Sequence, residues 1–107
     1  MADVILALTT WPDEEGAADF ARHLLENGLA ACVNIAPAMR SYYVWQGKIN
    51  VGTEHQLLIK TTRQHQHAIE SALQAEHPYE LAEFLVLPIA SGSEAFLNWI
   101  HESTHAE

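Results

Sequence analysis

A short segment at positions 77–80 holds the residues best suited to bind a ligand or a metal ion. It reads His77-Pro78-Tyr79-Glu80 and directly follows a predicted helix. Imidazole, phenol and carboxylate groups therefore lie close together in a loop, and loops held by a rigid scaffold commonly carry binding residues. The alternative is a structural role in which His77 ends the helix. The residues alone leave both interpretations open.

Three further residues could complete such a site from the extended segment that precedes it. Glu54 and Lys60 are six positions apart on one predicted strand, so their side chains point to the same side unless a bulge intervenes. Trp45 precedes a predicted turn and is either an interface anchor or a pocket wall. A pocket shared between two chains that gathers these three residues and His77 is geometrically allowed.

Other histidines carry less weight as metal ligands. His65 and His67 are two positions apart near a helix start, so they point to different sides, and we expect them at a solvated helix end. His101 and His105 are four positions apart and would chelate a metal only if the chain stayed helical there. We expect the polar tail 101–107 to fray instead.

Charge and cysteine content exclude several classes of protein. The chain has 107 residues, 14 acidic and 5 basic, with a formal net charge of −9. Phosphate binding needs clustered Lys and Arg, so we expect no nucleic-acid partner. The single cysteine, Cys32, excludes an intrachain disulfide and multi-cysteine zinc or iron–sulfur motifs.

Motifs for organic cofactors and for enzyme active sites are also missing. The glycines form neither GxGxxG nor a Walker loop, and no GxSxG elbow occurs. No apolar run is long enough to span a bilayer, and residues 1–4 lack a basic, signal-like start. We therefore expect a cytoplasmic protein that is not an enzyme, has no organic cofactor and does not contact a membrane.

Apolar patterns predict the elements of the first third of the chain. The run at 3–10 indicates a buried strand, and the Trp11-Pro12 pair after it is a turn signal. A helix opens at Pro12 and stops at Asn27-Gly28. Its predicted apolar face consists of Ala17, Phe20, Ala21, Leu24 and Leu25.

A long hairpin follows. Two arms rich in β-branched and aromatic residues, at 29–45 and 49–62, flank a turn at 46–48, and Pro37 bends the first arm. Roughly sixteen residues at about 3.3 Å each span about 50 Å, whereas a domain of this size has a radius of gyration of about 13 Å. The hairpin must therefore overhang its own domain, and we expect another copy of the chain to cover its apolar tip.

The remaining elements complete the fold class. The pattern predicts a helix at 63–76, a strand at 84–89 and a short helix after 91–93. The inward residues of the helix at 63–76 are expected to be Ala68, Ile69, Ala72 and Leu73. The order β-α-β-β-α-β is that of an α+β, ferredoxin-like sandwich, here with a short C-terminal helix. We expect residues 1–107 to form one domain.

The predicted sheet has apolar residues on both faces, although both long helices cover the same face. A second layer is therefore needed over the open face. This is an independent reason to expect association between copies of the chain.

The whole chain resembles the CutA divalent-cation tolerance family. The resemblance covers about nine tenths of the sequence, in the family's order and spacing, and is carried by LAACVNI at 29–35, SYYVWQGKI at 41–49, EHQLLIKTT at 54–62, HPYELAEFLVLPI at 77–89 and FLNWI at 96–100. It implies a ferredoxin-like protomer in a tight homotrimer whose hairpins wrap around neighbours. It also implies a cytosolic role in tolerance of copper and other divalent metals, and an architecture similar to PII-type signalling proteins.

The resemblance also suggests site residues. His77 matches a family histidine implicated in metal binding, and Glu54 matches a carboxylate near that site. Some relatives have a cysteine before the first helix, where this chain reads Thr9-Thr10-Trp11-Pro12, so a copper site built on that thiol is not expected. Ala82 also stands where the family usually has a proline.

Two functional hypotheses follow. In the first, His77 and Glu54 bind Cu(II) or Zn(II) weakly, since imidazole and carboxylate groups suit these ions. In the second, the protein is a PII-like small-molecule sensor or an interaction scaffold, with Trp45, Lys60 and Tyr79 in clefts between subunits. The physiological metal, the small molecule and any protein partner are left open by the sequence.

Overall fold

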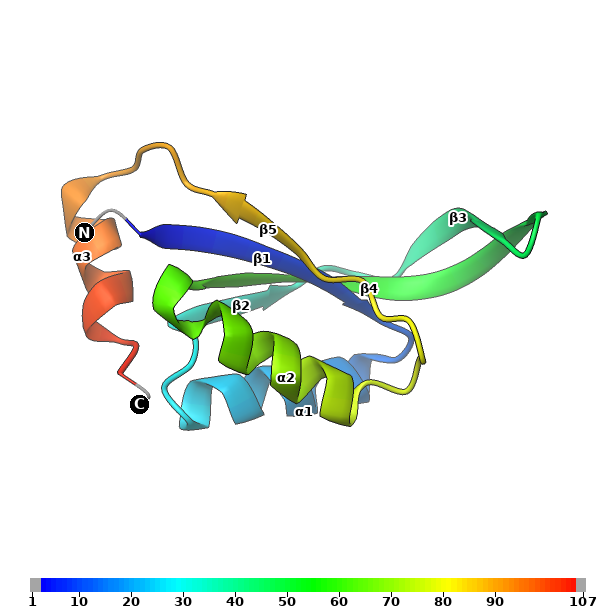
Figure 1. The fold of residues 1–107 in the computed structure, drawn as a ribbon, viewed down its shortest axis with the longest axis horizontal. Helices are drawn as coiled ribbons and strands as arrows, with labels where there is room; N and C mark the ends of the chain where they lie inside the picture. The colour runs from blue at the N-terminus through cyan, green and yellow to red at the C-terminus, as the bar shows by residue number, and fades with distance from the viewer. Residues whose placement is uncertain (1–2, 106–107) are drawn as a thin grey trace.

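The computed structural model of the chain describes residues 3–105 (Figure 1). Its elements follow the predicted β-α-β-β-α-β order, with the second predicted strand divided into two. They are β1 (Val4–Trp11), α1 (Glu14–Glu26), β2 (Cys32–Ile35), β3 (Met39–Trp45), β4 (Lys48–Thr62), η1 (Arg63–His65), α2 (Gln66–Glu76), β5 (Leu85–Pro88) and α3 (Glu94–Glu102). None of the described helices is both long and apolar enough to cross a membrane.

The sheet is antiparallel, and its long strand β4 pairs with three other strands. The order is β2-β4-β1-β5, while β3 pairs with the outer half of β4. In the centre, Ala7 of β1 lies opposite Ile59 of β4 on one side and Val86 of β5 on the other. β5 is an edge strand, which agrees with the proline at its end, since Pro88 has no N–H to donate.

Capping side chains decide where α1 and α3 begin. The side chain of Asp13 accepts a hydrogen bond from the Gly16 N–H at 2.8 Å, so α1 starts at Glu14. The predicted start at Pro12 is wrong because Trp11 continues β1 and Asp13 supplies the cap. Ser93 caps α3 in the same way, through the N–H of Phe96 at 3.2 Å.

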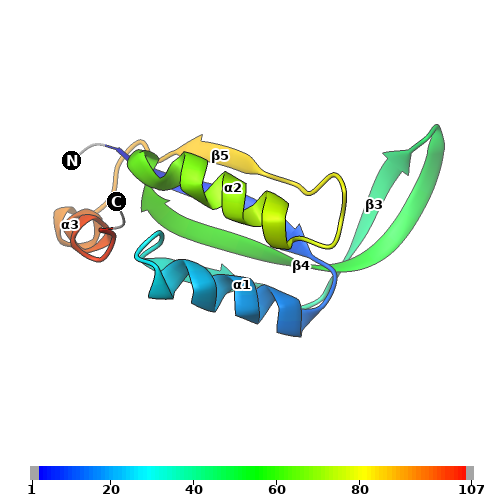
Figure 2. The same cartoon turned by 60° about the horizontal axis from the view of Figure 1, so that its bottom comes forward.

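The core lies between one face of the sheet and the helices α1 and α2, which Figure 2 shows together on the same side. Its buried residues are Ala7, Trp11, Ala17, Phe20, Leu24, Ala30, Leu57, Ile59, Ile69 and Leu73. Two residues predicted to point inward are exposed, Leu25 and Ala68. Each directly adjoins a buried helical residue, and one step along a helix turns the side chain by about 100°, away from the core.

The hairpin made by β3 and β4 extends beyond the helices, as predicted (Figure 1). The molecule measures 44 Å along its longest axis and 25 Å along the next. Residues 36–38, which include Pro37, separate β2 from β3. At the tip, Gln46 and Gly47 have φ values of 52° and 78°, which a tight turn between antiparallel strands requires.

Apolar side chains remain exposed on two connected parts of this structure. On the hairpin, the exposed large apolar residues are Tyr42, Tyr43, Val44, Trp45, Ile49 and Val51. Residues of β1, β4 and β5 that alternate with the core residues form the face of the sheet away from α1 and α2. On this face Leu85 is 57% and Leu87 43% exposed. The predicted two-sided apolar sheet is therefore confirmed.

Two expectations about histidines and the C-terminal tail are wrong. His65 is only 3% exposed, because the η1 turn directs it inward rather than to a solvated helix end. Over 101–105 the tail is ordered: α3 continues to Glu102, Thr104 is buried and the His105 N–H donates to the Gly28 carbonyl at 3.0 Å. Residues 106–107 of the predicted tail lie outside the described part of the chain.

Candidate functional site beneath the hairpin

His77 lies at the end of α2 and is 8% exposed. Its Nδ1 accepts a hydrogen bond from the Tyr79 N–H at 3.0 Å, and its Nε2 lies 2.7 Å from the Thr10 carbonyl oxygen. Because Nδ1 accepts, Nε2 must carry the proton and donate it to the carbonyl. The ring is therefore held as one neutral tautomer, with both nitrogens engaged inside the protein.

A row of aromatic rings connects this histidine to the core. The centroid of Trp11 lies 5.0 Å from Phe20 and 4.3 Å from His77, and His77 lies 4.9 Å from Tyr79. Trp11 is 4% exposed and belongs to β1. Trp11 is the last residue of the strand, where it pairs with His55, and the turn predicted at Trp11-Pro12 begins one residue later, at Pro12.

Thr10 links His77 to Glu54. Its hydroxyl donates to Glu54 Oε2 at 3.2 Å, while its backbone carbonyl accepts from His77. The two predicted metal ligands thus contact the same residue, one through the side chain and one through the backbone. Sequence reasoning assigned Thr10 no role, since a threonine near the end of an apolar strand carries no local signal of such contacts.

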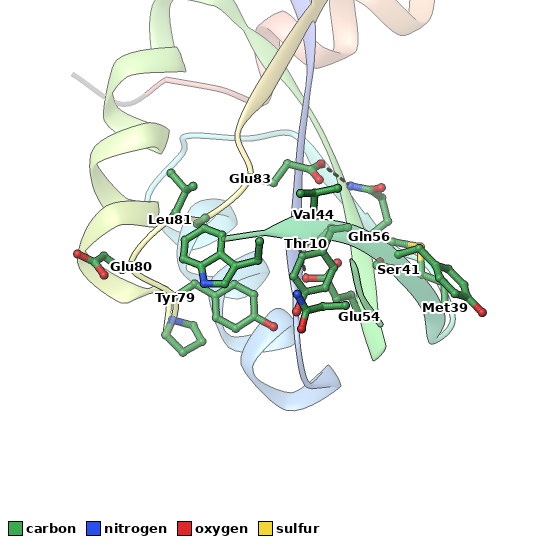
Figure 3. A pocket seen from close by; sticks show the side chains of 16 residues that line it. Thr10, Met39, Ser41, Val44, Glu54, Gln56, Tyr79, Glu80, Leu81 and Glu83 are labelled. Atoms are coloured by element: carbon green, nitrogen blue, oxygen red, sulfur yellow. Dashed lines mark hydrogen bonds between the residues drawn. The ribbon is translucent and has the colours of Figure 1, made fainter. Parts of the chain in front are cut away.

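A cleft of about 930 Å³ lies between the hairpin and the loop at 78–83. Figure 3 shows side chains from this loop facing those of β1, β3 and β4. Its acidic lining residues are Glu54, Glu80 and Glu83. Glu83 is held by the Gln56 side-chain amide at 3.1 Å, and that amide also donates to the Thr9 carbonyl at 2.8 Å. Gln56 and Glu83 were not predicted as site residues.

Tyr79 brings an aromatic ring and a hydroxyl to the cleft. In Figure 3 its phenol points toward the strands that carry Thr10 and Glu54. Partial burial raises the pKa of Tyr79 above its ordinary value, and the nearby Glu54 carboxylate and Tyr43 hydroxyl raise that pKa further. The phenol thus stays protonated at neutral pH and retains a proton to donate.

The structure gathers most of the candidate residues in this cleft but leaves Lys60 out. Trp45, Glu54 and Tyr79 line the cleft, and His77 lies behind it against Thr10. Lys60 shares the sheet face of Glu54, as its even spacing predicts, but pairs with Leu6 and Cys32 farther along the sheet. Its Nζ lies 5.8 Å from the centre of the Phe96 ring of α3.

The donor set fits a divalent cation only in part. Within residues 3–105, no three His, Cys, Asp or Glu residues come together in a group that could hold a metal ion. Glu54 supplies a carboxylate, and His77 supplies a nitrogen only when one of its two hydrogen bonds opens. Two protein donors leave the remaining positions around the ion to water or to another chain.

Comparison with known proteins assigns the chain to a family. Residues 5–103 match the family described as CutA1 divalent ion tolerance protein. The chain belongs to this CutA1 family. The Divalent-cation tolerance protein CutA of Pectobacterium atrosepticum is 42% identical over 103 residues, which cover 96% of this chain and 94% of that protein.

Solved structures of CutA1 proteins share the fold. The divalent cation tolerance protein (Cut A1) from Thermus thermophilus has a TM-score of 0.93 and 41% identity, covering 95% of this chain and 99% of that one. The periplasmic divalent cation tolerance protein CutA from Archaeoglobus fulgidus has a TM-score of 0.90 and 35% identity, covering 94% and 97%. The mixed α+β fold with an antiparallel sheet and three α-helices is therefore that of CutA1 structures.

Proposed function

We propose that this chain acts in divalent-cation tolerance as a cytoplasmic homotrimer, by binding rather than by catalysis. The cation is Cu(II) or Zn(II), held weakly by Glu54 and His77. The observation that carries this proposal is the double contact at Thr10, whose hydroxyl and carbonyl engage the carboxylate and the imidazole. A carboxylate oxygen and an imidazole nitrogen together suit these two ions.

The hydrogen bonds of His77 explain why binding is weak. For His77 to coordinate a cation as a neutral ring, either Nδ1 releases the Tyr79 N–H, or the ring proton moves from Nε2 to Nδ1 and both hydrogen bonds are lost. Either change gives up at least one buried hydrogen bond, worth about 1 kcal/mol. The loss of these contacts lowers the net affinity for the cation.

Copper titration of the assembled protein tests this proposal. We expect His77→Ala and Glu54→Gln each to weaken Cu(II) binding relative to the wild type, measured by calorimetry. The matched control is His67→Ala, because His67 is an exposed histidine on α2. Equal affinity in wild type and His77→Ala would remove His77 from the site, and equal affinity in Glu54→Gln would remove the carboxylate.

The exposed apolar surfaces support the homotrimer. Large exposed apolar patches mark interaction sites, and here the hairpin exposes Val44 and Ile49 while the open face of the sheet exposes Leu85 and Leu87. Other copies of the same chain can cover these surfaces. Light scattering should give a mass three times the 11.9 kDa of the chain. A stable monomer at micromolar concentration would contradict the proposal.

The cytoplasmic location is a separate part of the proposal. It rests on the cytosolic role that the resemblance to the CutA family implies. One structural relative is named as a periplasmic protein. The shared fold therefore does not determine where this chain is located. Cell fractionation with an antibody against the chain tests it, and recovery outside the cytoplasm would overturn it.

The cleft supports a second candidate function, a PII-like small-molecule sensor or interaction scaffold. Its volume of about 930 Å³ is in the range of ligand pockets, and Trp45 and Tyr79 line it. Lys60, named with them from the sequence, would have to come from a neighbouring chain. Native mass spectrometry of the purified protein should detect a retained small molecule or a stoichiometric partner. A metabolite screen without any thermal shift would count against the sensor.

A further inference from the structure

We propose that Lys60 of one chain pairs with Glu54 of a neighbouring chain, so that a second copy of the chain occupies the cleft beneath the hairpin in the assembled protein. This inference rests on the proposed homotrimer and names two charged residues that join its chains. The cleft is then a site that a single chain leaves incomplete.

Lys60 differs from the other basic residues of the chain, because it is half-buried on the open face of the sheet. The other four, all exposed, are Arg22, Arg40, Lys48 and Arg63. Within residues 3–105, the Lys60 ammonium group has the Phe96 ring as a neighbour but forms no ion pair with a carboxylate. The homotrimer covers this face. Covering a charge that has no partner of opposite sign is unfavourable, so the neighbouring chain should supply a carboxylate.

Glu54 supplies a carboxylate on the other surface that assembly covers. It is half-buried, it lines the cleft, and the side chain that binds it there is the neutral hydroxyl of Thr10. None of the described residues that line the cleft is Lys, Arg or His. The raised pKa of Tyr79, to which Glu54 contributes, agrees with a negative charge that no cation of the same chain compensates. The cleft and the open face of the sheet therefore carry complementary charges.

The two residues are too far apart to pair within one chain. They lie six positions apart on β4, so their Cα atoms are separated by about 20 Å. A contact between two different surfaces of the same chain is heterologous, and repeating it closes a ring when the rotation allows. In a ring of three, each chain gives Glu54 to one neighbour and Lys60 to the other. The hairpin reaches beyond the helices of its own chain, as this contact requires (Figure 1).

The other carboxylates of the cleft are less suited to pair with Lys60. Glu80 is exposed, and Glu83 already accepts a hydrogen bond from the Gln56 amide at 3.1 Å. Both lie on the loop before β5, whereas Glu54 lies on the sheet itself and faces the same side as Lys60. A neighbouring sheet that covers this side therefore meets Glu54.

A double-mutant cycle with Glu54→Gln, Lys60→Gln and the double variant tests the pair. Light scattering measures the protein concentration at which half of the chains dissociate in a fixed concentration of urea, with a chelator present so that bound cations do not contribute. Each single variant should raise this concentration by about tenfold, because one charge loses its partner. The double variant should raise it by less than the product of the two single effects. In the control cycle Glu26→Gln, at an exposed position on α1, replaces Glu54→Gln, and its effect should be independent of Lys60→Gln.

Charge reversal tests whether the pair joins two chains. Glu54→Lys alone and Lys60→Glu alone place like charges at every contact of the ring and should prevent assembly. An equal mixture of the two variants restores opposite charges at two of the three contacts in each mixed ring and should assemble. A pair within one chain would give no such recovery.

Three outcomes would overturn the inference. The first is independent effects of Glu54→Gln and Lys60→Gln in a protein whose wild type is a trimer, which would leave the proposed homotrimer intact. The second is coupling of Lys60→Gln to Glu83→Gln in place of Glu54→Gln, which would assign the pair to the loop. The third is a monomeric wild type, which would reject the homotrimer and this inference together.

Discussion

The imidazole of His77 donates a 2.7 Å hydrogen bond to the backbone carbonyl of Thr10, and this contact ties the loop after α2 to the end of β1. The same ring accepts the Tyr79 N–H, so it also sets the conformation of the loop that borders the cleft. His77 is therefore first a structural residue, and any role in metal binding draws on a ring that already has two partners.

Replacing His77 with alanine should lower the free energy of unfolding by about 2–4 kcal/mol. The substitution leaves the Thr10 carbonyl and the Tyr79 N–H without the ring and removes its packing against Trp11. Urea denaturation at fixed protein concentration measures the change. The exposed His67→Ala is the control and should change stability by about 0.5 kcal/mol or less. Equal effects in the two variants would show that the buried contacts of His77 contribute little.

Replacing Thr9 with valine should raise the free energy of unfolding by about 1 kcal/mol. Thr9 is 0% exposed, and among the described residues its hydroxyl has no hydrogen-bond partner. Valine has nearly the same shape and no polar group to desolvate. Thermal and urea unfolding measure the gain, with the exposed Thr53→Val on β4 as the matched control. Destabilisation by Thr9→Val would mean that the hydroxyl has a partner in solution.

His65 should make the protein less stable in mildly acidic solution. Burial, and secondarily the charge of His105, lowers the pKa of His65 below its ordinary value of 6.5 in the folded state. Between the two pKa values, His65 is protonated in the unfolded chain but not in the folded chain. The free energy of unfolding therefore falls as the pH falls through 6.5 toward the lowered pKa of the folded state. Above pH 6.5, His65 does not lower the free energy of unfolding in this way.

The measurement for His65 is the free energy of unfolding between pH 7.5 and 5. The chain has six other histidines, so the test compares wild type with His65→Gln and with the exposed control His67→Gln. The decline with falling pH should be shallower in His65→Gln alone. Parallel curves for all three proteins would assign the acid sensitivity to other groups.

Replacing Leu87 with glutamate should break the proposed homotrimer. Leu87 is 43% exposed on the open face of the sheet, and a charge there would have to be buried between subunits. Light scattering and sedimentation should show a shift toward the single-chain mass. The control Glu26→Gln on α1 changes charge away from that face and should assemble normally. An unchanged mass for Leu87→Glu would place the interface elsewhere.

Most of the fold follows from local patterns in the sequence. The long β4 and the turn at Gly47 are predictable because alternation, β-branched residues and a glycine act over neighbouring positions. The same alternation predicts that the side chains of Glu54 and Lys60 lie on the same face of the sheet. The apolar residues on both faces of the sheet are also predictable from the sequence, and because both long helices pack on one face, the other face stays exposed in the single chain.

The burial of residues where these elements contact each other does not follow from local patterns. Trp11-Pro12 is a turn signal by composition, yet Trp11 is buried because the rings of Phe20 and His77 pack against it. His65 is read as solvated from its place near a helix start, although the η1 turn directs it into the protein. In both cases, residues distant in the chain decide burial.

The candidate site shows the same division. Residue types and spacing indicate His77, Glu54, Tyr79 and Trp45 as candidates, because imidazole, carboxylate and aromatic groups can bind ligands. Only the tertiary structure places Thr10 between Glu54 and His77 and Lys60 outside the cleft. The physical reason is that strand register and the need to pair buried polar groups act across the whole fold, whereas periodicity acts over a few neighbouring residues.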